Sequence, residues 1–401
     1  MKALEGIRVV DLTVWFQGPV AAQHLADFGA DVIKVERPNG GDQGRGVRSI
    51  KALPVADWNQ YFLVINRNKK SIAIDLKKER GREILYRLVE KSDVFLSNMG
   101  IELLEGWNLG YDKLSSINPR LVYATNTGYG RFGAVNKPSF DMTVQALTGL
   151  MARLGEPGQP PIYLGMGSGD AYGGLMSALA IMMALHQRRR SGRGQWVDAS
   201  LYGAQLYLTG QALQAYLAGD TSRAQQRSRM DVVNPLWNVY QAADKWLFLC
   251  AHNNDVGWEK VVRALQANQL GSDERFATAA ARCSNGRALV EALDAVFATA
   301  SAQSWCDRLR AEGLPASPIG NLADLAADPQ AWANDYFVKT HCEEVQREVD
   351  VRGLPIGLGK TPGTVETLGP ELGQDTELLL TDLLDYSWED VAELKDAGVI
   401  P

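Results

Sequence analysis

Short runs of β-branched residues alternate with helical patterns over the first 125 residues, and this alternation restricts the fold more than any other feature. Strands are expected over residues 7–10, 32–35, 72–76, 94–96 and 121–125. After Gly18-Pro19 a helical pattern runs to Gly29, and residues 79–90 carry the pattern of an amphipathic helix. Strand–helix–strand units with short crossovers build parallel sheets that helices cover on both faces. The alternation therefore predicts an α/β fold with a doubly wound, mostly parallel sheet.

The middle of the chain has a different pattern. Residues 237–249 alternate as in an antiparallel hairpin around Ala243-Asp244-Lys245. Helical patterns follow over 258–265, 288–298 and 302–312. A chain of 401 residues usually needs more than one core. We therefore expect a large Rossmann-like domain over 1–224, a small α/β domain over 225–325, and a return to the large domain over 326–401.

Composition and spacing argue against several kinds of partner. The formal net charge of -6 gives no general attraction to nucleic acid. The longest apolar run, Leu175 to Leu185, is too short to span a membrane and predicts a buried helix whose Met182 and Met183 fill the core. The four cysteines lack a CxxC spacing, and the four histidines form no HxxxH or HExxH pattern. We expect a cytoplasmic protein without a metal, a prosthetic group, or a nucleic-acid or membrane partner.

One glycine-dense segment, residues 165–174, is the strongest candidate for chemistry. Five of its ten residues are glycine, and Asp170 lies among them, just before an apolar helical run. Such a turn leaves backbone N–H groups free to face an anion or a developing oxyanion. Aspartate is also a favoured N-cap, so the segment taken alone is explained at least as well by helix capping. It matches neither GxGxxG nor a P-loop.

A series of motifs in a fixed order along nearly the whole chain supports a second interpretation of Asp170. They occupy residues 4–13, 18–19, 25–36, 66–72, 75–77, 118–123, 127–130, 145–151, 155–157, 191–198 and 397–400. Together they resemble the class III CoA-transferases, of the formyl-CoA:oxalate, carnitine and bile-acid types, a family that also includes the α-methylacyl-CoA racemases. The resemblance implies that Asp170 is the catalytic nucleophile.

In such a reaction the aspartate attacks the donor thioester, and a mixed anhydride and then an aspartyl-CoA thioester form on the enzyme. The acceptor acid repeats these steps in reverse. The resemblance places Phe16, Gln17, Gly167 and Gly169 near the acyl group. It also implies interlocked, ring-like dimers. A homodimer is expected, and a heteromer with a similar subunit remains open. CoA thioester is a substrate here, not a bound cofactor.

The resemblance also implies contacts to CoA. The positions that carry over are Arg37, Ile74, Asp75, Lys77, Asn98, Met99, Gly100, Lys137, Phe140 and Asp141. The chain departs from the family at Gly100 and Gly106, where many members have arginine. Lys137 or Arg131 would then supply the missing positive charge. Residues 229–234 contain no glycine, so the glycine lid of the formyl-CoA type is missing and oxalate is not the expected acceptor.

Two alternatives within the same family stay open. A racemase needs acid–base groups on both faces of an α-carbon, and the family's racemases have histidine before the aspartate where this chain has Phe140. The second alternative is a subunit of a heteromeric transferase. A CoA-binding module without chemistry has no positive sign in the sequence. For the transferase, an apolar set that includes Trp15, Phe16 and Met166 favours a bulky or aromatic acid as acceptor and succinyl-CoA as donor.

Overall fold

The computed structural model describes residues 1–51, 55–133, 138–224 and 226–401. The chain forms two compact units. Unit 1 contains Met1–Met151, Tyr163–Gln211 and Gln330–Pro401, and unit 2 contains Ala152–Ile162 and Ala212–Pro329. The small unit thus starts before residue 225, ends after residue 325, and takes in an additional segment that the sequence pattern did not indicate.

A six-stranded parallel sheet forms the centre of unit 1. Its strands are β1 (Arg8–Leu12), β2 (Asp31–Glu36), β3 (Lys70–Ala73), β4 (Val94–Ser97), β5 (Val122–Thr125) and β6 (Trp196–Asp198). Their order is β3-β2-β1-β4-β5-β6, and each neighbouring pair is parallel. The order reverses between β1 and β4, and in sheets of this kind ligands bind at the carboxyl ends of the strands at such a point. The predicted parallel α/β sheet is confirmed, whereas β6 was not expected.

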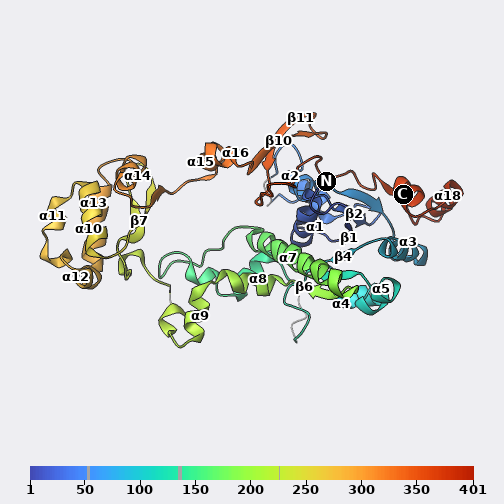
Figure 1. The fold of residues 1–401 in the computed structure, drawn as a ribbon, viewed down its shortest axis with the longest axis horizontal. Helices are drawn as coiled ribbons and strands as arrows, with labels where there is room; N and C mark the ends of the chain where they lie inside the picture. Colours follow the sequence, from blue (N-terminus) through green and yellow to red (C-terminus); the bar gives the residue numbers. More distant parts are fainter. Residues whose placement is uncertain (52–54, 134–137, 225) are drawn as a thin grey trace. The chain divides into compact units, whose positions relative to one another are not determined.

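Successive residues of each strand point to opposite faces of the sheet, and both faces are buried. Val10 and Ile33 belong to one apolar cluster, and Val9 and Val32 belong to the other. The first face is covered by α3 (Glu79–Glu90), α4 (Ile101–Gly106), α5 (Tyr111–Ile117) and α18 (Trp388–Asp396). The second is covered by α1 (Gln17–Asp27) and α7 (Ser168–Ser191), the long green helix in Figure 1.

The C-terminal part of unit 1 packs on its N-terminal part. The orange hairpin of β10 (Phe337–Cys342) and β11 (Arg347–Arg352) lies beside the blue α2 (Gln60–Ile65) in Figure 1, and side chains from both share one apolar cluster. The remaining elements are η1 (Gln43–Ser49), α6 (Asp141–Leu147), η2 (Met151–Arg153), α8 (Leu201–Leu208), α16 (Pro329–Ala333), α17 (Thr376–Leu378) and η6 (Leu379–Leu383). Ser387 caps α18 by accepting a hydrogen bond from the Asp390 N–H at 3.1 Å.

Unit 2 has its own antiparallel sheet and its own core. The predicted hairpin is confirmed as β7 (Trp237–Gln241) and β8 (Trp246–Cys250), and β9 (Ala316–Pro318) pairs with β8. The helices and short turns are α9 (Gln211–Leu217), η3 (Thr221–Ala224), η4 (Arg229–Asp231), α10 (Asp255–Leu265), α11 (Asn268–Gly271), η5 (Glu274–Phe276), α12 (Ala279–Ser284), α13 (Gly286–Phe297), α14 (Ala302–Ala311) and α15 (Leu322–Ala326).

The apolar run in α7 is buried on one side only. Ile181 and Leu185 are in the core, but Leu179 is 48% and Met183 is 61% exposed. The prediction that Met182 and Met183 fill the core is therefore wrong in the single chain, because Met182 is 37% exposed and lines an apolar hollow, and Met183 is more exposed still. Among the described residues, no helix is both long enough and apolar enough to span a membrane.

Candidate active site

The loop between β1 and α1 begins at the carboxyl edge of the sheet, where ligands bind in folds of this kind. The side-chain amide of Asn98 donates to the Val14 carbonyl at 2.6 Å and accepts from the Val14 N–H at 2.9 Å. Trp15 has a positive φ of 66°, and its N–H donates to Asp42 Oδ1 at 3.1 Å. These bonds fix the residues that immediately precede Phe16 and Gln17.

Two buried ion pairs lie against the same loop. Lys34 Nζ lies 2.9 Å from Asp42 Oδ2, and both side chains are fully buried. Lys34 also donates to the Thr13 carbonyl at 2.8 Å. Burial opposes the charge on Lys34, but the carboxylates of Asp42, Asp11 and Glu36 outweigh it and raise its pKa. The second buried pair joins Lys69 Nζ to Asp11 Oδ2 at 2.8 Å.

We expect Asp42→Ala to destabilise the protein by about 3–5 kcal/mol, because it leaves the Lys34 charge buried and unpaired. Urea unfolding of unit 1 measures this loss. Asp350→Ala is a matched control, since the Lys339–Asp350 pair has a similar separation of 2.8 Å but is exposed, and this variant should cost less than about 1 kcal/mol. Equal losses in the two variants would contradict this reasoning.

Asp170 lies in the first turn of α7. The N-cap of that helix is Gly167, whose φ of 78° favours glycine, so Asp170 does not cap the helix. Burial, and to a lesser extent the nearby carboxylate of Asp141, together raise the pKa of the Asp170 carboxyl to about 7. A partly buried carboxylate that has no cationic partner among the described residues is poorly stabilised as an anion. Asp170 is therefore suited to react rather than to hold a structure together.

The four residues expected near the acyl group meet at the start of α7. The Phe16 ring lies 3.6 Å from the point where a Gly167 Cβ would be, and Gln17 packs against Gly173 and Gly174. Gln17 is held there because its amide donates to the Ala199 carbonyl at 3.1 Å.

Tyr61 also belongs to this site, although the sequence analysis did not identify it. Its ring lies 5.6 Å from that of Phe16. Burial and then the charges of Asp170 and Asp42 raise the pKa of its hydroxyl. Tyr61 is therefore a neutral hydroxyl donor beside Asp170. It stands in α2, outside the motifs that carry the family resemblance, and only the fold brings it beside Phe16.

Gly169 lets Asp141 approach the backbone beside Asp170. A Cβ at Gly169 would lie 2.2 Å from Asp141 Oδ1 and 2.1 Å from Gln205 Nε2, far inside van der Waals contact. Asp141 is buried as the first residue of α6, whereas the preceding Phe140 is 60% exposed. Of the predicted aromatic–acidic pair, only the carboxylate is thus packed into the site of the single chain.

The sequence of the whole chain identifies the protein class to which this site belongs. Residues 4–376 match the model of CoA-transferase family III. The chain belongs to this family. It is 32% identical over 408 residues to the succinyl-CoA–D-citramalate CoA-transferase of Chloroflexus aurantiacus, with 100% of this chain and 98% of that protein covered. It is 33% identical to the succinyl-CoA:glutarate CoA-transferase of Mus musculus, with 100% and 91% covered.

A solved structure agrees with this assignment. The CAIB/BAIF family protein from Brucella suis matches the fold with a TM-score of 0.81 and 31% identity, with 95% of this chain and 99% of that chain covered. This protein is therefore a family III CoA-transferase, an enzyme that transfers CoA groups.

The CoA contacts expected for this CoA-transferase lie after successive strands on one edge of the sheet. Ile74, Asp75 and Lys77 follow β3, and the Lys77 N–H donates to Asp75 Oδ1 at 3.1 Å. Arg37 follows β2 and is exposed, with its guanidinium donating to the Gly41 carbonyl at 2.9 Å. These four residues follow β2 and β3, on the β3 side of the β1 loop that carries Phe16.

Asn98, Met99 and Gly100 follow β4, next to the β1 loop. Added side-chain atoms at Gly100 or Gly106 would meet nothing within 4 Å, so both positions are open. Arg131 stacks on Trp196, with its guanidinium carbon 3.4 Å from the ring centre. The predicted contact Lys137 lies outside the described residues.

The activity of this CoA-transferase should follow the ionisation of Asp170. Because the attacking species is the carboxylate and its pKa is raised to about 7, kcat/KM should rise with pH through about 7 and level off above it. A carboxyl near its ordinary pKa would instead give a constant kcat/KM from about pH 6 upward. Initial rates measured against pH with succinyl-CoA as donor distinguish the two profiles.

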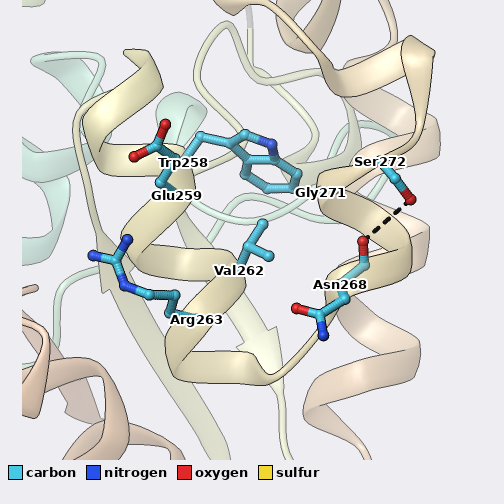
Figure 2. A pocket seen from close by; sticks show the side chains of 7 residues that line it. All are labelled: Trp258, Glu259, Val262, Arg263, Asn268, Gly271 and Ser272. Carbon is cyan, nitrogen blue, oxygen red and sulfur yellow. Dashed lines mark hydrogen bonds between the residues drawn. The ribbon is translucent and has the colours of Figure 1, made fainter.

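Unit 2 has a hollow of its own, between α10 and α11. Its volume is about 370 Å³, and it is lined by Trp258, Glu259, Val262, Arg263, Asn268, Gly271 and Ser272 (Figure 2). Arg263 pairs with Glu312 at 3.1 Å, and Ser272 Oγ donates to the Asn268 carbonyl at 3.2 Å. None of these residues was expected to take part in the reaction. Among the described residues of either unit, no group of three or more His, Cys, Asp or Glu is placed to hold a metal ion.

Proposed function

We propose that this enzyme moves CoA from succinyl-CoA to a carboxylic acid through covalent intermediates on Asp170. The observation that carries the proposal is the position of this carboxylate, partly buried at a glycine-rich turn beside Phe16, Gln17 and Tyr61. A carboxylate with a raised pKa is a stronger nucleophile than one in water, and a thioester is a good acyl donor.

Each step breaks one bond and forms another. An Asp170 oxygen attacks the thioester carbonyl of the donor, the C–S bond breaks, and CoA leaves as the thiolate from a mixed anhydride. The thiolate then attacks the aspartyl carbonyl, which releases the donor acid and leaves an aspartyl-CoA thioester. The acceptor carboxylate attacks that thioester, and the returning thiolate attacks the acceptor carbonyl and frees Asp170. Backbone N–H groups at Gly167 and Gly169 and the Tyr61 hydroxyl are our candidates for stabilising the oxyanions.

We propose a short aliphatic dicarboxylic acid as the first acceptor to test. The relatives from Chloroflexus aurantiacus and Mus musculus are named for D-citramalate and glutarate, which are both acids of this kind, and both are named for succinyl-CoA. The bulky or aromatic acceptor favoured by Trp15, Phe16 and Met166 remains a prediction. A panel of both acid classes, with the new CoA ester identified by mass spectrometry, decides between them.

We propose that CoA itself binds along the carboxyl edge of the sheet. The strand order supports a Rossmann-like fold for unit 1. In such folds nucleotides bind at the point where the strand order reverses. Ile74, Asp75 and Lys77 would receive the adenosine part. Asn98, Met99 and Gly100 would line the path toward Asp170. We keep the cytoplasm as the expected location, in which the four cysteines would stay reduced.

A racemase has less support than a transferase. The proton transfer of a racemase needs a titratable group where this chain has the exposed Phe140. If the purified enzyme exchanged the α-proton of a 2-methylacyl-CoA for deuterium and transferred no CoA, the transferase proposal would be wrong.

We also propose that two copies form an interlocked, ring-like dimer. The outer face of α7 and the adjoining α8 expose Leu179, Met183 and Tyr207, an apolar surface that a partner would bury. Met183→Asp should then give monomers in light scattering after size-exclusion chromatography. Trp388→Asp is a matched control, because Trp388 is as exposed as Met183, at 61%, but lies elsewhere in unit 1. If the wild-type protein were itself monomeric, the homodimer proposal would be wrong, and a different subunit would be the expected partner of this apolar surface.

A further inference from the structure

Two glutamine side chains hold the Asp141 carboxylate. Gln205 Nε2 donates to Asp141 Oδ1 at 2.9 Å, and Gln145 Nε2 donates to the same oxygen at 3.1 Å. Both glutamines are fully buried, and Asp141 is 5% exposed. Rotating either amide by half a turn would place an oxygen against the carboxylate, so the observed orientation is the favourable one.

The glutamines connect Asp141 to two other elements. Gln205 comes from α8, and Gln145 comes from the next turn of α6. The Gln145 side chain also accepts from the Leu164 N–H at 2.9 Å and donates to the Gly165 carbonyl at 3.2 Å. These two backbone groups belong to the loop that leads into α7 and Asp170. The position of Asp141 is therefore tied to the segment that carries the nucleophile.

Asp141 packs against the residue next to Asp170, and only one of its two carboxylate oxygens accepts hydrogen bonds from the described residues. Asp141 Oδ1 and Gln205 Nε2 both press on Gly169, the residue before Asp170. Asp141 Oδ2 and Gln205 Oε1 are buried without a hydrogen-bond partner among the described residues. The two N–H donors on Oδ1 stabilise the Asp141 carboxylate. Within the part of the chain that the structure describes, no cation offsets its effect on Asp170, whose pKa is raised by burial and by Asp141.

The other titratable groups on the elements packed around the pair are tyrosines or lie far along their helices. The tyrosines are Tyr61 on α2, Tyr172 on α7, and Tyr202 and Tyr207 on α8. His24 and Asp27 lie toward the far end of α1, and His186, Arg188, Arg189 and Arg190 lie at the opposite end of α7, more than about four turns from Asp170. The tyrosines are uncharged near neutral pH. Asp42 interacts with Tyr61 and carries a negative charge of its own, paired with Lys34. Asp141 is thus the dominant charge that acts on Asp170.

We propose that Gln205 and Gln145 are positioning residues that hold Asp141 as a fixed anion beside Asp170, so that acylation of Asp170 relieves the repulsion between the two carboxylates. This inference rests on the proposed nucleophilic role of Asp170. When the Asp170 oxygen bonds to the acyl carbon and the CoA thiolate leaves, the negative charge of Asp170 disappears. The site therefore favours the covalent intermediates over the free carboxylate, and it does so only while Asp141 remains charged and in place.

The test is a double-mutant cycle between Gln205→Met and Asp141→Asn, measured as kcat against pH with succinyl-CoA and the best acceptor acid. Methionine keeps the volume of Gln205 but removes the N–H donor. The Asp141 carboxylate should then no longer be held beside Gly169, its effect on Asp170 should weaken, and the acid limb near pH 7 should move to lower pH. We expect kcat to fall about 10-fold to 100-fold in Gln205→Met. In the Asp141→Asn background the same change should cost almost nothing.

Several outcomes overturn the inference. The first is a Gln205→Met variant whose kcat and acid limb match those of the wild type. The second is a cycle in which the effects of Gln205→Met and Asp141→Asn on kcat simply multiply, because a purely structural role would make the two changes independent. Gln145→Met serves as the second variant if Gln205→Met does not fold, as judged by thermal melting, and should shift the acid limb in the same direction. A wild-type enzyme that transfers no CoA would instead contradict the proposed function, which the wild-type rate reports before any variant is compared.

Discussion

Replacing Asp170 with asparagine should lower kcat for CoA transfer by at least about 10⁴-fold, because the change removes the atom that bonds to the acyl group. Asparagine preserves the shape of the side chain, so the site around Phe16 and Tyr61 should stay intact. Steady-state rates with succinyl-CoA measure the loss, and isothermal titration with CoA should show that binding is retained. A variant with more than about a hundredth of the wild-type kcat would show that another group attacks the thioester.

The same variant should be more stable than the wild type at neutral pH. Because the folded-state pKa of Asp170 is raised from 3.8 to about 7, the folded protein holds this proton more tightly than the unfolded chain does. The wild type therefore loses stability as pH rises from about 4 to 7, and Asp170→Asn does not share that loss. The difference in Tm should be close to zero near pH 4 and largest above pH 7. An equal difference in Tm at both pH values would show that it does not come from ionisation.

Gly169→Ala is the second change with a large expected effect. The added methyl group would lie 2.1 Å from Gln205 Nε2 and 2.2 Å from Asp141 Oδ1, so the two side chains or the α7 backbone must move. A displacement of about 1 Å at a reacting group commonly costs on the order of 100-fold in rate, and overpacking costs about 1–3 kcal/mol in stability. We expect both losses in rate assays and urea unfolding.

Gly106→Ala provides the matched control for Gly169→Ala. A Cβ at Gly106 meets nothing within 4 Å, and Gly106 is likewise in a helix. Alanine is favoured over glycine inside helices by about 1 kcal/mol, so this variant should keep the wild-type rate and gain slightly in stability. If both variants lost activity to the same degree, the packing of Gly169 against Asp141 would not be the cause.

Local patterns predicted the elements of the sheet well where the apolar signal was strong. The amphipathic stretch 79–90 coincides with α3, and the runs at 32–35 and 94–96 lie within β2 and β4. These segments bury one face or both faces against the core, so their periodicity is visible in the sequence. β6 was missed because it spans only Trp196–Asp198, and its residues are half-buried, which leaves no alternation to read.

The β10–β11 hairpin was missed for a different reason. Its strands alternate between apolar and charged residues, such as Val349 and Asp350, but each is only six residues long and they are joined by a polar turn. Such short stretches are as easily read as loop. Its apolar side is covered by Trp58 and Val64 from far along the chain, and that contact could not be known beforehand.

The candidate site was predictable only in its contiguous part. Asp170 and its glycines stand in one segment, and Phe16 and Gln17 stand in one motif. Tyr61 and Gln205 were not identified, because each is an ordinary helix residue whose role depends on a neighbour more than 60 positions away, as in the Gln205–Asp141 bond with a separation of 64. The N-cap reading of Asp170 failed for a simpler reason: Gly167 occupies that position.

The most direct test of the central claim is to trap the covalent intermediate. The purified protein is incubated with succinyl-CoA, treated with hydroxylamine or borohydride, and digested for peptide mass spectrometry, with Asp170→Ala as the control. Our account predicts a modification on the peptide that contains Asp170, located on that residue, and its absence from the variant. CoA transfer that proceeds at the normal rate with Asp170 unmodified, or a modification on a different residue that persists in Asp170→Ala, would contradict it.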